Sequence, residues 1–469
     1  MKISSWSALC GVLLLASPSV APALTLNLAR PYDPAYSPPR ATEMAFTFPK
    51  QETAVFKTPE EAIVEISTPA QKYLTGKWKL SHNLVTTPLI EGELSQIDDM
   101  RFVLPLPVDK LQPGFYDLQI ELAGDVTTGK NAQVATGTTT FGWKVDQMKP
   151  TAVAPEGFAE FWKKTVADIR ALPLNMKVEF VQKLTGSEID SYNRKSTCLP
   201  GNYDPAGKVY DEVEIYRVSF DSPNGGRVYT WFCKPVGDGP FPGLLVLPGA
   251  GNNARPAPVE HARHGWAAMD VQIHGFPVDL PLYPALPPNK PTKVEEHEGY
   301  RIYRNALMAV NALAALPSVD PSRLAVCGGS QGGRMTVVVS ALDERIRAGV
   351  AAITHFSELP RLNWAKEMNR LKSNGAQGYE VVENKEGVAF DEWFDVSNFA
   401  PLINKPMLFN MGMIDKISPA SCIQSVYAQV KGDKEMIYLP TMGHDWSPSF
   451  DRRAWKWLNA EVPPSSDKK

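Results

Sequence analysis

The sequence has no excess of either charge, and beyond its first residues it has no long apolar run. Its 469 residues include 48 Lys and Arg against 51 Asp and Glu, a formal net charge of −3. Such a balance gives no electrostatic basis for nucleic-acid binding. After residue 23 no apolar stretch approaches the roughly 20 residues that span a bilayer. We therefore expect neutral partners, no nucleic acid and no integral membrane segment in the mature chain.

Metal-binding and nucleotide-binding motifs are also lacking. The seven His and five Cys show no metal-site spacing. The glycines after Leu247 do not follow the G-x-G-x-x-G order of a dinucleotide-binding turn. We therefore expect neither a metal nor a cofactor. Cys327 lies in an apolar run and is expected to be buried. Cys198 and Cys233 can pair in an oxidising compartment, although the sequence does not fix their geometry.

Residues 1–23 have the pattern of a secretory signal peptide. Lys2 precedes an apolar run at 9–16, and small residues follow at Ala21 and Ala23. The run is too short for a bilayer, which favours a cleaved signal over a retained anchor. Leu9 before Cys10 argues against a lipoprotein signal. The mature protein is therefore expected to be secreted or periplasmic.

The length favours two domains, and the hydrophobic pattern changes near residue 148. In 24–147, short alternating runs such as 116–122 indicate strands and predict a small Ig-like β-sandwich. In 148–462, apolar runs alternate with helical segments, which predicts a mostly parallel sheet with helices on both faces. Residues 463–469 are expected to form a disordered tail.

Strands of the second domain are predicted at 244–247, 267–271, 324–327, 350–354, 407–411 and 436–439. Helices are predicted at 300–316, 331–342, 420–430 and 453–458.

The strongest chemical signal is Gly328-Gly329-Ser330-Gln331-Gly332. A G-x-S-x-G pattern alone is weak, and the alternative is a glycine-rich turn with an incidental serine. Here the pattern follows a predicted strand and precedes a predicted helix, as a nucleophile elbow requires. Its glycines permit the strained turn and a close approach of strand and helix. We therefore predict an α/β-hydrolase fold with Ser330 as the nucleophile.

A serine hydroxyl needs a base to remove its proton, and in this fold the order along the chain is serine, acid, histidine. Only His355 and His444 follow Ser330. His444 lies between the last predicted strand and the last helix, which suits the base. His355 directly follows a strand, which suits the wall of a substrate pocket, and His274 is a second candidate for substrate binding.

The acid is expected on the loop after strand 407–411, where Asp415 lies. It would fix the tautomer of His444 and stabilise the imidazolium. Asp433 and Asp445 are alternatives, each in a position where a carboxylate is commonly solvated.

The oxyanion of a tetrahedral intermediate needs two donors. We assign the backbone N–H groups of Gln331 and Ala250, the latter on the loop after strand 244–247. The alternative for that loop is a plain turn. Residues 276–291 include six prolines, and this stiff segment is expected either to border the acyl site or to form a surface connection.

With these residues placed, 150–460 resemble the acetyl xylan esterase and cephalosporin C deacetylase family, carbohydrate esterase family seven. The matching blocks are 300–305, 316–320, 328–333, 393–400, 412–415 and 443–444. Two motifs differ, because the family's His-Gly-Tyr is Pro248-Gly249-Ala250 here and its Arg-Gly-Gln is replaced by Gln272-Ile273-His274-Gly275. The leading β domain is similar to that of a two-domain exported branch.

The resemblance implies removal of acetyl or other short acyl groups from carbohydrate hydroxyls, such as those of acetylated xylan. The triad itself predicts an acyl-enzyme but not which ester. Alternatives are a general carboxylesterase or a serine peptidase of the same fold, and a carbohydrate-binding protein with a degenerate hydrolase domain. A peptidase with an N-terminal β-propeller is not expected, because the region before residue 148 is too short to form a propeller. The sequence leaves oligomerisation open.

Overall fold

The computed structural model describes residues 44–68, 73, 75–98, 100–124, 134–195, 209–250, 256–280, 283–284, 290–373, 390–445 and 447–463. The predicted signal peptide, Cys198 and residues 464–469 lie outside these ranges. The possible pairing of Cys198 with Cys233 and most of the predicted tail are therefore outside the described residues. Within the described ranges, no helix has the length and apolar character needed to cross a membrane.

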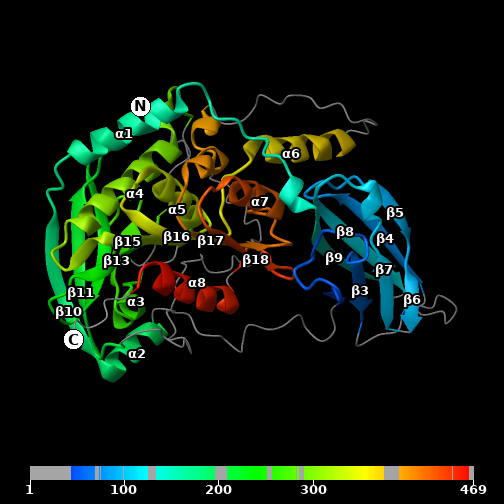
Figure 1. Cartoon of the computed structure of the whole chain (residues 1–469), viewed down its shortest axis with the longest axis horizontal. Helices are drawn as coiled ribbons and strands as arrows, with labels where there is room; N and C mark the ends of the chain where they lie inside the picture. The colour runs from blue at the N-terminus through cyan, green and yellow to red at the C-terminus, as the bar shows by residue number, and fades with distance from the viewer. Residues whose placement is uncertain are drawn as a thin grey trace, which may run out of the picture.

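The first part of the chain forms two β-sheets that pack face to face (Figure 1). The four-stranded sheet has the order β1-β3-β7-β6, and the five-stranded sheet β2-β9-β8-β4-β5. Their bounds are Ala45–Thr47 (β1), Val55–Phe56 (β2), Ile63–Ser67 (β3), Thr75–His82 (β4), Ile90–Glu93 (β5), Ser95–Asp98 (β6), Arg101–Pro105 (β7), Gly114–Ala123 (β8) and Val134–Trp143 (β9). In β4, Trp78 and Leu80 are buried while Lys77 and Lys79 are exposed, the alternation expected of a sheet with one face in the core. The N-terminal β domain is confirmed.

The second part is built on a nine-stranded sheet of order β10-β11-β12-β14-β13-β15-β16-β17-β18. The strands are Lys177–Thr185 (β10), Glu212–Asp221 (β11), Arg227–Pro235 (β12), Phe241–Leu247 (β13), Ala267–Gln272 (β14), Val319–Gly329 (β15), Ile346–Ala352 (β16), Met407–Gly412 (β17) and Lys434–Leu439 (β18). β13 to β18 pair in parallel, while β10, β11 and β12 pair antiparallel. The predicted fold class is confirmed, but the three antiparallel strands were absent from the prediction.

Helices cover both faces of this sheet because its strands are apolar on both sides. In β13, Leu245 and Leu247 pack toward α1, α4 and α5, whereas Leu244 and Val246 pack toward α8. The helices are Phe158–Ala171 (α1), Gly186–Lys195 (α2), Val259–Arg263 (α3), Glu298–Ala314 (α4), Gln331–Leu342 (α5), Leu359–Ser373 (α6), Ala420–Gln429 (α7) and Pro448–Glu461 (α8). In Figure 1, α1, α4 and α5 lie above the sheet, and α3 and α8 lie below it.

Most predicted bounds differ from the structure by a few residues. The helix after the elbow begins and ends where it was predicted, whereas α8 is longer than the predicted 453–458. The predicted strand 350–354 instead ends at Ala352. There Ile353 has a φ of 37°, which turns the chain out of the strand.

The sandwich packs against the β17 and β18 edge of the large sheet (Figure 1). Its buried core includes Met411 and Met413 at the end of β17, and Ala420 and Ile423 of α7. The two domains therefore share one apolar core at this edge.

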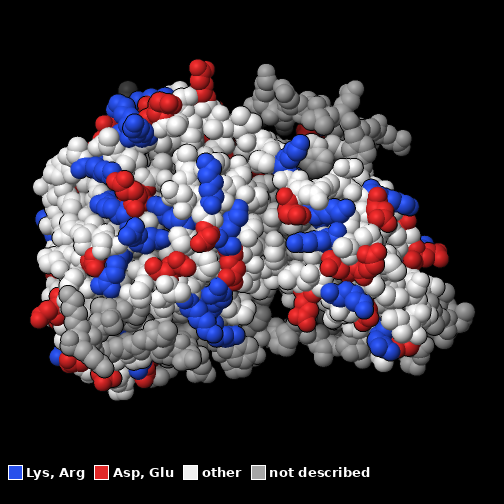
Figure 2. Space-filling model, viewed as in Figure 1, with Lys and Arg blue, Asp and Glu red and all other residues white. Residues whose placement is uncertain are grey.

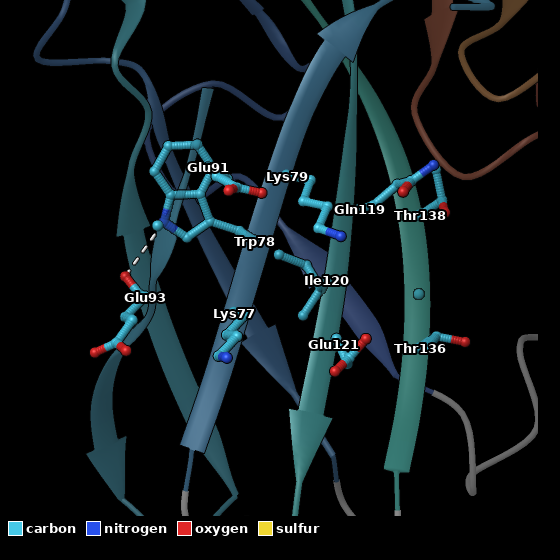
Figure 3. A pocket seen from close by; sticks show the side chains of 12 residues that line it. Lys77, Trp78, Lys79, Glu91, Glu93, Gln119, Ile120, Glu121, Thr136 and Thr138 are labelled. Carbon is cyan, nitrogen blue, oxygen red and sulfur yellow. Dashed lines mark hydrogen bonds between the residues drawn. The ribbon is translucent and has the colours of Figure 1, made fainter. Parts of the chain in front are cut away.

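The surface of both domains carries both charges. On the face shown in Figure 2, basic and acidic side chains are interspersed over both domains. A groove of about 660 Å³ lies over β4, β5, β8 and β9 (Figure 3). Lys77 pairs in register with Glu93 on one side and Glu121 on the other.

Among the described residues that line this groove, Trp78 is the one aromatic residue. It is only 8% exposed and its indole N–H donates to the Glu93 carbonyl. The groove therefore offers a polar surface, and Trp78 belongs to the core.

Candidate active site

Ser330 lies on a sharp turn between β15 and α5. Its backbone has φ 56° and ψ −115°, a conformation that a non-glycine residue rarely adopts. The turn is held because Ser330 N–H donates to the Ala352 carbonyl and Ser330 O accepts from His355 N–H. This strained strand–turn–helix geometry is that of a nucleophile elbow.

The glycines of the motif are needed for close approach. A Cβ on Gly328 would lie 2.6 Å from the Gly332 carbonyl carbon, and a Cβ on Gly332 would lie 2.2 Å from the Leu247 carbonyl oxygen. Since backbone atoms occupy these places, only glycine lets β13, β15 and α5 meet here. The neighbouring Gly333 has the same role, because its Cβ would lie 2.5 Å from the Ala352 oxygen.

His444 links the serine to an acid. Its Nε2 lies 2.9 Å from Ser330 Oγ, and its Nδ1 lies 2.8 Å from Asp415 Oδ2. Because a carboxylate only accepts, Nδ1 carries the proton and Nε2 is free to accept the serine proton. Ser330, His444 and Asp415 thus form one hydrogen-bonded chain in the order that general-base activation of a serine requires.

Asp415 is fully buried and its second oxygen is also engaged. Oδ1 accepts from the backbone N–H groups of Ile417 and Ser418. These bonds leave Oδ2 directed at the imidazole. Of the two other candidate acids, Asp433 is exposed, and the carboxylate bonded to His444 Nδ1 belongs to Asp415 rather than to Asp445.

The loops that carry the acid and the histidine are packed together. A Cβ on Gly412 would lie 2.3 Å from the Gly443 oxygen, so the end of β17 contacts the backbone just before His444. Ile414 N–H donates to the Met442 carbonyl across the same contact. The spacing between Asp415 and His444 is therefore fixed by backbone packing.

The two candidate oxyanion donors lie on segments that touch. Gln331 is the first residue of α5, where backbone N–H groups have no acceptor within the helix and the helix dipole favours negative charge. The loop after β13, which carries the exposed Ala250, rests on the same turn through the Leu247 and Gly332 contact. The two candidate donors therefore belong to segments whose backbones are in contact.

His355 lies beside the acid loop. Its Nδ1 is 3.2 Å from the Ile417 carbonyl, and its backbone contacts Ser330. Burial, followed by the positive charge of Arg334, lowers the pKa of His355 to about 4. The imidazole is therefore neutral near pH 7 and available only for hydrogen bonding.

His274 is buried, with only 5% of its surface exposed. Its Nδ1 lies 2.8 Å from the Pro284 carbonyl, and its ring stacks on Tyr283 with centroids 4.7 Å apart. Among the described residues, Nε2 has no hydrogen-bond partner. The structure thus joins His274 to the proline-rich segment 276–291.

Two residues beside the elbow were missed by the sequence analysis. Tyr283 is buried and its hydroxyl lies 3.5 Å from Gln331 Oε1, which brings the proline-rich segment to the elbow. Arg334, on the first turn of α5, is buried with its guanidinium 3.9 Å from the Phe356 ring and its Nε donating to Tyr303 Oη. Tyr283 lies in the proline-rich segment that was expected either to border the acyl site or to form a surface connection, but nothing in the sequence distinguished it from its neighbours. Arg334 directly follows the block 328–333 and had no separate signal.

Comparison with known proteins identifies the family of this chain. The profile of the acetyl xylan esterase (AXE1) family matches residues 193–461, more than half of the chain. The chain belongs to this family. Membership makes it a carboxylic ester hydrolase of the acetyl esterase type, and the matched range contains Ser330, Asp415 and His444.

One relative, an acetyl esterase, matches the chain over both domains. The chain is 23% identical to the acetyl esterase Axe7A of Xylanibacter ruminicola over 454 residues, 91% of this chain and 92% of that protein. Acetyl xylan esterase 1 from Thermoanaerobacterium sp. JW/SL YS485 has a similar fold, with a TM-score of 0.51 and 19% identity over 67% of this chain and 96% of that one. The acetyl xylan esterase from Paenibacillus sp. R4 aligns over 68% of this chain and 98% of that one, with 20% identity and a TM-score of 0.49.

Proposed function

We propose that this AXE1-family esterase removes acetyl groups from carbohydrate hydroxyls, such as those of acetylated xylan or xylo-oligosaccharides, and that Ser330, His444 and Asp415 are its catalytic triad. The hydrogen-bonded chain from Ser330 Oγ through His444 to Asp415 carries the proposal. The family and the Axe7A relative support the acetyl group.

In the proposed first half-reaction, Ser330 Oγ attacks the acetyl carbonyl carbon while His444 Nε2 takes the hydroxyl proton. The carbonyl oxygen becomes an oxyanion that accepts hydrogen bonds from the N–H groups of Gln331 and Ala250. The tetrahedral intermediate then breaks the bond to the sugar oxygen, which leaves with the proton from His444. An acetyl ester of Ser330 remains.

The second half-reaction repeats the same transfers with water. His444 Nε2 takes a proton from the attacking water, and the second tetrahedral intermediate releases Ser330 Oγ, which recovers the proton. The products are acetate and the free enzyme. Asp415 stays ionised throughout and stabilises the imidazolium that forms twice in each cycle.

The substrate assignment is tested by acetate release from acetylated xylan, compared with butyryl esters and peptide substrates. We expect acetate release, little activity on butyryl esters and none on peptides. Preference for longer acyl chains would favour a general carboxylesterase, and peptide cleavage would favour a peptidase. Carbohydrate binding without turnover would favour the degenerate-hydrolase alternative.

The role of Ser330 is tested separately with 4-nitrophenyl acetate. Ser330→Ala should lose several powers of ten in turnover, because triad members act as a unit. Unchanged turnover in this variant would contradict the assignment of the nucleophile.

We further propose that the protein is exported. The basis is the pattern of residues 1–23. N-terminal sequencing of protein recovered from the producing cells should begin near Leu24, and a start at Met1 would contradict cleavage.

A further inference from the structure

We propose that the β-sandwich positions the acid of the catalytic triad, with Asp117 and Lys416 as the positioning pair. Lys416 immediately follows Asp415, and its ammonium lies 2.8 Å from Asp117 Oδ2 on β8 of the sandwich. This inference rests on the proposed role of Asp415.

Lys416 lies inside the turn that orients the acid. Asp415 Oδ1 accepts from the N–H groups of Ile417 and Ser418, so the turn closes around Lys416. Any displacement of the Lys416 backbone therefore moves the two amides that direct Asp415 Oδ2 toward His444.

The Asp117 carboxylate is held in a fixed position by the sandwich. It is 5% exposed, in the body of the sandwich. Its Oδ1 accepts from Asn83 Nδ2 and Thr140 Oγ1, and its Oδ2 accepts from Leu84 N–H as well as from Lys416. Three donors within the sandwich thus fix the carboxylate independently of Lys416.

The segments on both sides of the turn are also held by the sandwich. Before it, Met413 is buried in the sandwich core. After it, Ser421 Oγ donates to Asn83 Oδ1 at 3.0 Å, and Asn83 is itself bonded to Asp117. The acid turn therefore touches the sandwich at its start, middle and end.

The Lys416 contact is suited to positioning more than to stability. The Lys416 side chain is 50% exposed, whereas the Asp117 side chain is only 7% exposed. Asp117 keeps three donors within the sandwich when Lys416 is lost, so the pair adds only modestly to the free energy of unfolding. A triad, in contrast, is sensitive to displacements near 1 Å. Loss of the pair should therefore reduce turnover while leaving stability nearly unchanged.

A matched control exists elsewhere between the domains. Asn369 on α6 accepts from both the N–H and the hydroxyl of Thr86, and its side chain donates to the Leu84 carbonyl. These polar contacts join the same two domains and involve none of residues 415–418, and they reach Asp117 only through Leu84, whose N–H donates to Asp117 Oδ2. Asn369→Ala therefore tests domain contact in general.

The experiment measures kcat and KM for 4-nitrophenyl acetate and the thermal midpoint in the full mature chain. The variants are Lys416→Met, Lys416→Arg, Asp117→Asn, the Asp117→Asn/Lys416→Met double variant and Asn369→Ala. Ser330→Ala is the reference for the triad. The far-downfield proton resonance of His444 Nδ1–H reports the bond to Asp415 directly.

We expect Lys416→Met to lower kcat by about tenfold, with KM within twofold, an unchanged midpoint and a weakened His444 resonance. Lys416→Arg should recover most of the loss, and Asn369→Ala should keep kcat within twofold. The double variant should lose no more kcat than the more impaired of the two single variants, since both substitutions remove the same contact between Lys416 and Asp117.

Two results would overturn the inference. One is a Lys416→Met variant within twofold of the parent, which decides the question even if Asp117→Asn fails to fold. The other is a loss of kcat in Asn369→Ala as large as the loss in Lys416→Met. If Ser330→Ala kept its turnover, the proposed function itself would fail, so the two failures are distinguishable.

Discussion

Replacing Gly332 by alanine should disable the elbow while changing only one methyl group. The added Cβ would lie 2.2 Å from the Leu247 oxygen and 3.2 Å from the Pro248 carbonyl carbon. An ordinary non-bonded contact is about 3.5 Å. The first turn of α5 and the loop after β13 must therefore separate by about 1.3 Å, since both partners are backbone.

This separation acts on the proposed transition-state donors. The two segments carry Gln331 and Ala250, so one donor moves away from the oxyanion above Ser330. A misplacement of 1 Å costs about 10²-fold, and loss of one oxyanion donor costs about 10² to 10³-fold. We expect kcat to fall at least about 100-fold, equivalent to about 2.7 kcal/mol, with little change in KM because the donors act mainly in the transition state.

The assay is steady-state hydrolysis of 4-nitrophenyl acetate with thermal midpoints recorded in parallel. Gly114→Ala in β8 is the control, because its Cβ would have only ordinary contacts, the nearest at 3.7 Å. A folded Gly332→Ala enzyme within threefold of the parent would refute the argument that this contact sets the oxyanion geometry.

Three further outcomes are expected. Asp415→Asn should reduce kcat by about 10⁴-fold if the carboxylate controls the His444 tautomer, and a loss below tenfold would contradict that role. Burial lowers the pKa of His261 from 6.5 to about 3, so below pH 6.5 the unfolded chain binds a proton that the native state does not. The free energy of unfolding should therefore fall as the pH is lowered from 6.5 toward 3. In His261→Phe, denaturation curves recorded at several pH values should show a fall in this free energy that is shallower than in the parent by up to about 1.4 kcal/mol per pH unit. The same dependence on pH in both proteins would contradict this. Trp78→Ala should lower the free energy of unfolding by about 3 to 5 kcal/mol with unchanged esterase turnover; unchanged stability would show that Trp78 is not part of the core.

The strained turn at Ser330 and the hydrogen bond between Asp415 and His444 could be predicted because their signals are local or ordered along the chain. Glycines flank Ser330, and the strand and helix around it have clear periodicities, so α5 was predicted at its observed bounds. Asp415 follows from the order serine, acid, histidine and from its place after a buried strand. Both inferences need only the neighbouring sequence and the fold class.

Other features were missed for different physical reasons. β10 lies at the sheet edge and is exposed along most of its length. Its alternation of Lys177, Val178, Glu179 and Phe180 is broken by a bulge between Phe180 and Gln182, so the apolar pattern is too short to indicate a long strand. β11 and β12 do alternate and were predictable in principle. Tyr283 and the Asp117–Lys416 pair depend on contacts between distant segments, 299 residues apart for the pair, and no local pattern encodes them.

The shared core also constrains the order in which the protein folds. During synthesis the sandwich strands, which end at Trp143, are made long before Met411, Met413, Ala420 and Ile423. At about 5 to 20 residues per second, the interval is on the order of tens of seconds. Through that interval the nascent sandwich exposes an apolar surface that only the last quarter of the chain covers. Chain release before α7 is made would leave that surface open to aggregation, so truncated products should be far less soluble than the complete enzyme.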